Sequence, residues 1–285
     1  MVYEHEIPKG ARLYFGKSAR LKRDIEDIAS KILYKEGFEE ICTPLFSYHQ
    51  HHYIEDEREL IRLNDEKNRK LSLRADSTID VVRLITKRLG RSTEHRKWFY
   101  IQPVYKFPTK EFYQIGAEML DSRDIEKILK IVIKIFSELG IKPKLQLSNI
   151  KIAHILSQSY NLPLEVLKSS DIDKILEMGT GWIEKLLYLS EIGQIEGLLG
   201  IVPKDIADEL VKIKELADSI NYDNLIIAPL FYTKMRYYEE LFFRFFENNL
   251  TLAMGGEYES GDLEAAGFAI YSDNIIEIKK VENEG

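Results

Sequence analysis

The chain has 285 residues, of which 45% are hydrophobic and 31% charged, and this ordinary globular composition excludes a disordered or fibrous protein. A formal net charge of −7 argues against broad affinity for the phosphate backbone of nucleic acids. The single cysteine, Cys42, excludes a disulfide framework or a cysteine zinc site within the chain. Because no signal-peptide pattern and no run of about 18 apolar residues is found, we expect a cytoplasmic protein that does not enter the membrane.

The first predicted element is a helix that begins at Ser18 and ends before Gly37. Its apolar residues are spaced by 3, 4 and 7 positions, which places them on one face. They are Leu21, Ile25, Ile28, Ile32 and Leu33. Gly37 suits the left-handed position that closes a helix, and residues 38–44 then predict a strand that ends at Pro44.

The next hundred residues alternate strand and helix signals. Predicted strands cover residues 69–73, 98–107, 111–120 and 144–147, and predicted helices cover residues 77–88 and 124–139. The aromatic-rich pair 98–107 and 111–120 is joined by a short turn and reads as a hairpin.

Strand signals then vanish between residues 148 and 220, where helical periodicity replaces them. Short strands rich in aromatic and β-branched residues return at 225–232, 237–247, 250–256 and 265–271. The pattern predicts an α+β fold, an antiparallel sheet flanked by helices. We expect a single domain over residues 1–285, with a core of 1–147 and 221–285 and a helical insertion at 148–220.

Several segments, taken in chain order, resemble the catalytic domain of class II aminoacyl-tRNA synthetases of histidyl type. They are Ile7–Phe46, Leu73–Thr78, Phe112–Glu118, Met254–Glu259 and Gly267–Ile270. They are similar to the opening segment with motif 1, the substrate loop, the second half of motif 2, a glycine-glycine-x-tyrosine segment and the start of motif 3. The resemblance implies the antiparallel sheet and flanking helices of that domain.

The resemblance also implies a ligand pocket. Asp76, Thr78, Gln114 and Glu118 match positions that hold the histidine substrate in the synthetase. Paired carboxylates and an amide could receive an α-ammonium group and an imidazole. The alternative is that these side chains only join sheet to helix through hydrogen bonds.

The cations that grip ATP in the synthetase are replaced in this chain. Lys106 takes the place of the motif 2 arginine, Asn274 that of the motif 3 arginine, and Thr233 that of a histidyl-specific arginine. Adenylation needs such cations to neutralise the charge that develops on the phosphates. We therefore expect no catalytic residues and no enzyme activity, unless Arg236 or Lys279 reaches the ATP site.

Only Glu277–Gly285 follows the motif 3 segment, so we expect no anticodon-binding domain and no tRNA ligand. A synthetase-like core of this kind is similar to the regulatory subunit that pairs with the short form of ATP phosphoribosyltransferase, at the first step of histidine biosynthesis. The resemblance implies a hetero-oligomer in which this chain makes the catalytic subunit active and responsive to histidine. It also implies a homodimer through residues 38–46 and no cofactor. The alternatives are a paralogue that activates an amino acid and a free-standing amino-acid sensor.

Three further patterns each have a competing interpretation. His49, His51 and His52 crowd one segment, but no further histidine pair at ligand spacing accompanies them, so we expect an interface or solvated loop and no metal. The run Leu241–Phe246 reads as core rather than as a base-stacking platform. Gly255 and Gly256 read as a turn between strands rather than as a phosphate cradle.

Overall fold

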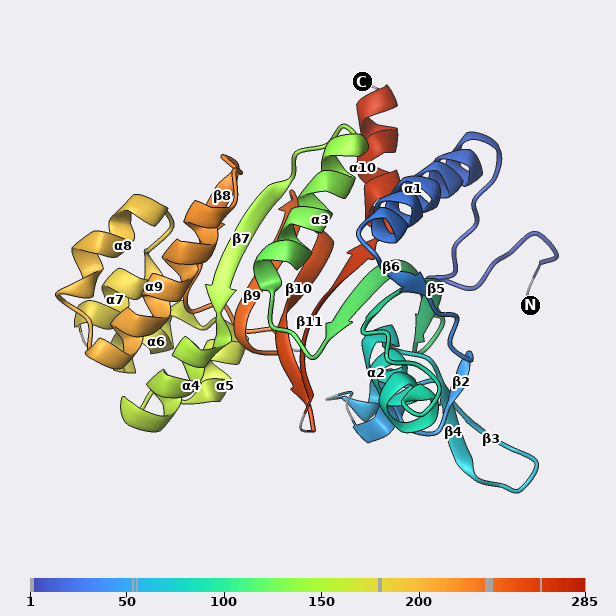
Figure 1. Ribbon diagram of the computed structural model, residues 1–285, viewed down its shortest axis with the longest axis horizontal. Helices are drawn as coiled ribbons and strands as arrows, with labels where there is room; N and C mark the ends of the chain where they lie inside the picture. Colours follow the sequence, from blue (N-terminus) through green and yellow to red (C-terminus); the bar gives the residue numbers. More distant parts are fainter. Residues whose placement is uncertain are drawn as a thin grey trace. The chain divides into compact units, whose positions relative to one another are not determined.

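The computed structural model describes residues 3–52, 54, 56–178, 181–233, 238–261 and 263–284, with side chains as far as residue 280. The chain divides into two compact units, shown together with their elements in Figure 1. Unit 1 comprises Met1–Leu120 and Phe268–Gly285, and unit 2 comprises Asp121–Gly267.

Unit 1 is built on the hairpin of β5 (Lys97–Lys106) and β6 (Lys110–Leu120), which pair antiparallel from Lys97↔Met119 to Lys106↔Lys110. The short strand β1 (Glu39–Glu40) pairs with β5 in parallel. Helix α1 (Gly16–Lys35) contacts β6 and α10 (Ser272–Glu284). As the periodicity predicts, α1 buries one apolar face, which includes Ile25, Ala29, Ile32 and Leu33. Helix α2 (Ser77–Leu84) contacts both strands of the hairpin and continues into a π-helical turn, η3 (Ile85–Leu89).

A second, three-stranded sheet in unit 1 has the order β2-β4-β3. Its strands are β2 (Phe46–Ser47), β3 (Arg62–Asn64) and β4 (Lys70–Leu73), and the 3-10 turns η1 (Gln50–His52) and η2 (Glu57–Glu59) lie between β2 and β3. The strand expected over residues 38–44 is reduced to β1. Strand β1 ends at Glu40, and Pro44, which has no N–H for a sheet ladder, lies between β1 and the first strand of the second sheet.

Unit 2 contains four paired strands in the order β10-β9-β7-β8. They are β7 (Lys144–Asn149), β8 (Leu225–Ile227), β9 (Tyr238–Glu247) and β10 (Leu250–Ser260), and the next strand, β11 (Leu263–Tyr271), begins in unit 2 and ends in unit 1. Strand β9 pairs antiparallel with β7 and β10, whereas β8 pairs in parallel with β7. Helix α3 (Ile125–Glu138) contacts β10. The α+β fold is thus confirmed, with parallel pairing added at β1 and β8.

Helices occupy the chain between β7 and β8, as the periodicity predicts. They are α4 (Ile150–Ser159), α5 (Leu164–Ser169), α6 (Ile172–Met178), α7 (Gly181–Leu187), α8 (Ile192–Leu199) and α9 (Lys204–Ser219). The apolar face of α9 is fully buried at Ile206, Leu210 and Ile213. The interpretation of residues 148–220 as an insertion into a single domain stays a prediction. Among the described residues, no helix combines the length and apolar character needed to span a bilayer.

The phenylalanine run in β9 is core, as expected: Phe242, Phe243 and Phe245 are completely buried. The glycine pair is a correction, because Gly255 and Gly256 lie inside β10 and not in a turn. A Cβ atom at Gly255 would collide with the neighbouring strand backbone and the Phe243 ring, and one at Gly256 with the Leu241 carbonyl. Glycine is therefore required here by close strand packing.

Candidate functional site

The structure buries all four residues of the predicted pocket in unit 1. Asp76 and Thr78 are 4% and 6% exposed, and Gln114 and Glu118 are 5% and 1% exposed. Asp76 precedes α2 and caps it, since its Oδ1 accepts a hydrogen bond from the Ile79 N–H at 3.2 Å. An aspartate at this position satisfies one of the free N–H groups of the helix, so Asp76 has a structural role whether or not it also binds a ligand.

Strand β6 presents Gln114 and Glu118 on the same face, because side chains alternate along a strand. Gly116 lies between them and is paired with Tyr100 of β5. A Cβ atom at Gly116 would collide with the Tyr100 ring, so the ring occupies the space that this glycine leaves. Tyr100 was not among the site residues predicted from the sequence. The alternation Gln114, Gly116, Glu118 opposite an aromatic strand was the signal that could have found it.

Tyr100 joins two of the four residues. Its hydroxyl lies 3.3 Å from Thr78 Oγ1 and donates to Glu118 Oε1 at 3.5 Å. The threonine of α2 and the carboxylate of β6 are thus brought together around one phenol.

Tyr271, the last residue of β11, lies near the other two residues, Gln114 and Asp76. Loss of hydration around its hydroxyl raises the Tyr271 pKa, and the nearby Asp76 carboxylate raises it further, while a hydrogen bond with Gln114 acts in the opposite direction. Among the described residues, Gln114 Oε1 is buried without a hydrogen-bond partner. An unpaired buried acceptor costs free energy, so this oxygen is suited to a donor on a ligand, such as an ammonium or an imidazole N–H.

The three positions predicted to replace ATP-binding arginines are Lys106, Asn274 and Thr233, and none of them provides an unpaired cation in the structure. Lys106, at the end of β5, forms an ion pair with Glu59, with Nζ 2.6 Å from Oε2. Asn274 lies in the first turn of α10, and Thr233 is buried in unit 2. Arg236 lies outside the described residues.

Asp273, next to Asn274, was missed by the sequence analysis. It is 3% exposed, accepts the Tyr113 N–H at 2.7 Å and accepts the Tyr14 hydroxyl. Burial raises the pKa of this carboxyl group, and the two donors oppose that shift. A carboxyl group at the start of α10 is unfavourable for the γ-phosphate that a motif 3 arginine would hold.

The histidines follow β2, and the His51 and His52 ring centroids are 3.9 Å apart. In the part of the chain that the structure describes, no three histidine, cysteine, aspartate or glutamate side chains are arranged to hold a metal ion. The interpretation as an interface or solvated loop stays a prediction.

The family model described as histidyl-tRNA synthetase matches residues 13–275. The ATP phosphoribosyltransferase regulatory subunit of Wolinella succinogenes is 48% identical over 285 residues, covering 100% of this chain and 99% of that protein. That of Helicobacter hepaticus is 39% identical over 277 residues, covering 97% and 99%.

Among solved structures, one described as an ATP phosphoribosyltransferase regulatory subunit/histidyl-tRNA synthetase from Bacillus halodurans C is similar, with a TM-score of 0.84. The match covers 97% of this chain and 84% of that chain at 19% identity. At this identity the likeness concerns the fold, and it agrees with the class II synthetase architecture that the motifs predicted.

Proposed function

This chain belongs to the histidyl-tRNA synthetase-like family that contains the ATP phosphoribosyltransferase regulatory subunits, and from that premise we propose that it is the regulatory subunit of an ATP phosphoribosyltransferase. The observation that carries the proposal is its agreement with two such subunits over nearly their whole lengths. Its role is to activate a short-form catalytic subunit at the first step of histidine biosynthesis and to make it responsive to histidine.

The subunit has no adenylation activity of its own in this proposal. The ion pair between Lys106 and Glu59 supports this, because it neutralises the one cation left at a motif 2 or motif 3 position. The buried Asp273 beside Asn274 supports it further, since a carboxylate repels phosphate. Removing a single donor of this type typically lowers a rate by ~10²–10³, and here several are replaced.

Histidine is the ligand that we assign to the pocket of Asp76, Thr78, Gln114 and Glu118. Gln114 Oε1, which has no partner among the described residues, and the neighbouring carboxylates are acceptors, and histidine brings donors in its α-ammonium and imidazole groups. Binding changes the activity of the complex only if histidine prefers one conformation of it.

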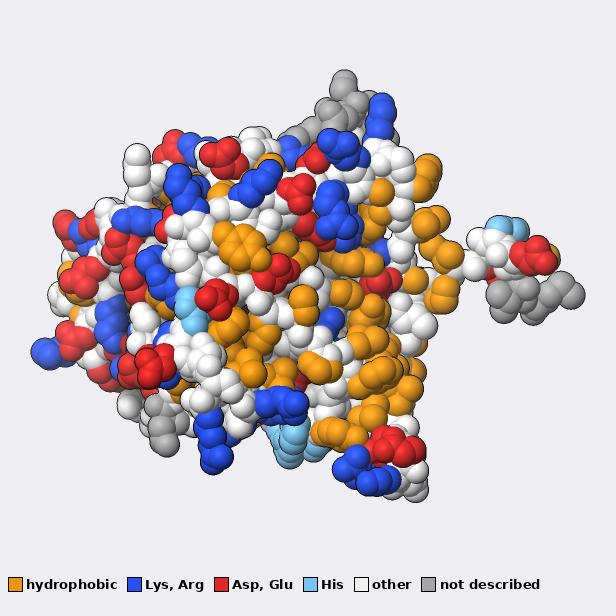
Figure 2. Space-filling view, turned by 45° about the vertical axis from the view of Figure 1, so that its right-hand side comes forward, with side chains coloured by type: hydrophobic (Ala, Val, Ile, Leu, Met, Phe, Trp, Pro, Cys, Tyr) orange, Lys and Arg blue, Asp and Glu red, His pale blue; other side chains and the backbone are white. Residues whose placement is uncertain are grey.

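The chain also forms a homodimer within the hetero-oligomer and acts without tRNA, in the cytoplasm. Residues 38–46 support the dimer, because Leu45 and Phe46 are 36% and 57% exposed at the end of this segment. Figure 2 shows hydrophobic side chains gathered on the face beside the N-terminal segment. Symmetric interfaces of this kind are the commonest among soluble oligomers.

The test is phosphoribosyl transfer to ATP by the short-form catalytic subunit of the same organism, measured with and without this protein. We expect co-elution on a sizing column and a higher rate when both chains are present. Equal rates without co-elution would contradict the regulatory role. Histidine-dependent ATP–pyrophosphate exchange above a no-enzyme blank would instead favour the amino-acid-activating paralogue.

A further inference from the structure

The small sheet β2-β4-β3 of unit 1 has one polar face. Its strands place Ser47 opposite Ser72, Ser72 opposite Arg62, and Lys70 opposite Asn64. Residues that face each other across strands point to the same side, and so do residues two apart along a strand. These five side chains therefore share a face that carries no carboxylate, while Phe46, Leu63, Leu71 and Leu73 share the other.

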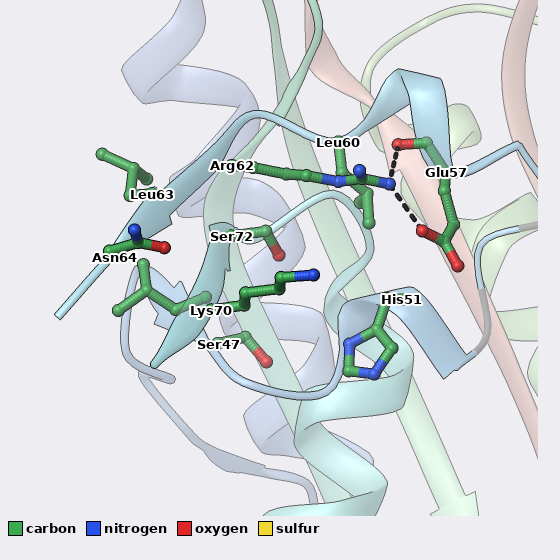
Figure 3. A pocket seen from close by; sticks show the side chains of 10 residues that line it. Ser47, His51, Glu57, Leu60, Arg62, Leu63, Asn64, Lys70 and Ser72 are labelled. Atoms are coloured by element: carbon green, nitrogen blue, oxygen red, sulfur yellow. Dashed lines mark hydrogen bonds and ion pairs between the residues drawn. The ribbon is translucent and has the colours of Figure 1, made fainter. Parts of the chain in front are cut away.

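The polar face forms one wall of a hollow of about 550 Å³, which Leu63 and Leu71 of the same strands also line. His51, Glu57 and Leu60 line it from the segment between β2 and β3. Figure 3 shows the side chains of Lys70, Arg62 and His51 extending around the same space, with the hydroxyl groups of Ser47 and Ser72 nearby. This volume falls in the range of sites for small molecules.

Cationic hydrogen-bond donors outnumber carboxylates among the described residues that line the hollow. Arg62 Nη2 donates to the Glu57 carboxylate oxygen Oε2 at 2.5 Å and to the Glu57 carbonyl oxygen at 3.1 Å. Among the described contacts, Nη2 is the one guanidinium nitrogen of Arg62 that forms a hydrogen bond. Lys70 has no carboxylate partner among the described ion pairs. Among the described residues that line the hollow, Glu57 is therefore the one carboxylate beside two permanent cations, in a chain whose net charge is −7.

We propose that this hollow binds a phosphate monoester that carries a small apolar group. A phosphate has three terminal oxygens and accepts hydrogen bonds from several directions, which suits a guanidinium, an ammonium and a hydroxyl that come from different strands. Arg62, Lys70 and Ser72 hold the phosphate, and the leucines that line the hollow contact the apolar group: Leu60, Leu63 and Leu71. This site is separate from the predicted histidine pocket, because none of its lining residues belongs to that pocket.

The test is binding of phenyl phosphate to the full chain by isothermal titration calorimetry, with inorganic phosphate as a second probe. The test variant is Lys70→Met, and the matched control is Lys67→Met in the turn of the same hairpin, outside the hollow. We expect Lys70→Met to weaken phenyl phosphate binding roughly tenfold, the size of one hydrogen bond to a charged group. Lys67→Met should bind like the wild type.

Phenyl phosphate should also bind more tightly than inorganic phosphate, because only the ester gains contact with Leu60. Equal affinities of the Lys70→Met and Lys67→Met variants would overturn the assignment of the phosphate site. Absence of binding to the wild type at about 10 mM phenyl phosphate would overturn it as well. Thermal unfolding of each variant by circular dichroism checks that a loss of binding is not a loss of fold. Activation of the catalytic subunit is not needed for any of these measurements.

Discussion

Two tyrosine hydroxyls organise the polar centre of unit 1. Tyr100 links Thr78 to Glu118, and Tyr271 lies beside Gln114 and Asp76. A phenol both donates and accepts hydrogen bonds, so each one can satisfy buried groups when no ligand is bound. These contacts can stabilise the carboxylates and the amide of the predicted pocket, and among the described residues Gln114 Oε1 is left as a buried acceptor without a hydrogen-bond partner.

Two substitutions at Asp76 separate its structural role from its ligand role. Asp76→Ala removes the cap of α2 and should lower the free energy of unfolding by about 1 kcal/mol. Asp76→Asn keeps a good capping residue but loses the charge, so it should fold normally and bind histidine more weakly. Denaturant unfolding and calorimetric titration with histidine give the two quantities. Unchanged histidine affinity in both variants would favour a purely structural role for Asp76.

Glu257 of β10 provides a pH-dependent prediction. Burial raises its pKa to about 7, although its carboxylate accepts the Leu241 N–H at 3.3 Å. The folded pKa lies above the unfolded value near 4.5, so stability is fully present below pH 4.5 and is lost as the pH rises to about 7. Glu257→Gln should therefore become more stable than the wild type across this window, by at most about 3 kcal/mol.

Thermal or urea unfolding between pH 4.5 and 8 measures that difference. Glu138→Gln is the matched control, because Glu138 is exposed at the end of α3. A stability difference between wild type and Glu257→Gln that does not change with pH would contradict the prediction.

At the level of elements, one buried arginine connects the two sheets of unit 1 through hydrogen bonds. Arg74 follows β4 and is 4% exposed. Its Nε and Nη2 donate to the Pro103 carbonyl of β5 at 3.0 and 2.8 Å, and its Nη1 donates to the Thr43 carbonyl at 2.9 Å. From the sequence, Arg74 was noted only as part of the segment Leu73–Thr78, with no role of its own. In the structure it connects the chain before β2, the end of β4, and β5.

Arg74→Lys should lower the free energy of unfolding by about 2–4 kcal/mol. A lysine ammonium cannot reproduce the planar fork, and buried carbonyl groups would lose their donors. Arg20→Lys is the control, because Arg20 forms an exposed pair with Asp24 on α1 and such pairs contribute at most about 1 kcal/mol. Urea unfolding compares the two variants, and equal losses would show that Arg74 does not fasten the sheets.

At the level of the whole molecule, the exposed apolar side chains of unit 1 suit an assembled protein. Leu13, Phe15, Phe46 and Phe107 are 57–75% exposed, and larger apolar surfaces of this type mark interaction sites. The proposed homodimer through residues 38–46 and the proposed catalytic partner would both cover such surface.

Light scattering of the isolated chain should therefore give the mass of a dimer at micromolar concentration. Phe46→Glu should shift the mass toward the monomer, because a charge would be buried in the proposed interface. Tyr188→Glu is the matched control, since Tyr188 is 62% exposed in the turn that follows α7 in unit 2. Wild-type protein that stays monomeric, or a dimer unaffected by Phe46→Glu, would contradict this interface.

The sequence by itself determined the helices with strong periodicity, the β5–β6 hairpin and the class II synthetase family, because amphipathic spacing and ordered motifs are local or linear properties. It also predicted that Asp76, Thr78, Gln114 and Glu118 matter together. Only the tertiary structure decided that Tyr100 and Tyr271 join these residues and that Asp273 is buried beside Asn274. It also decided that the glycine pair lies within a strand. Those outcomes depend on which strands become neighbours, and pairing partners distant in the chain leave no periodic signal in either segment.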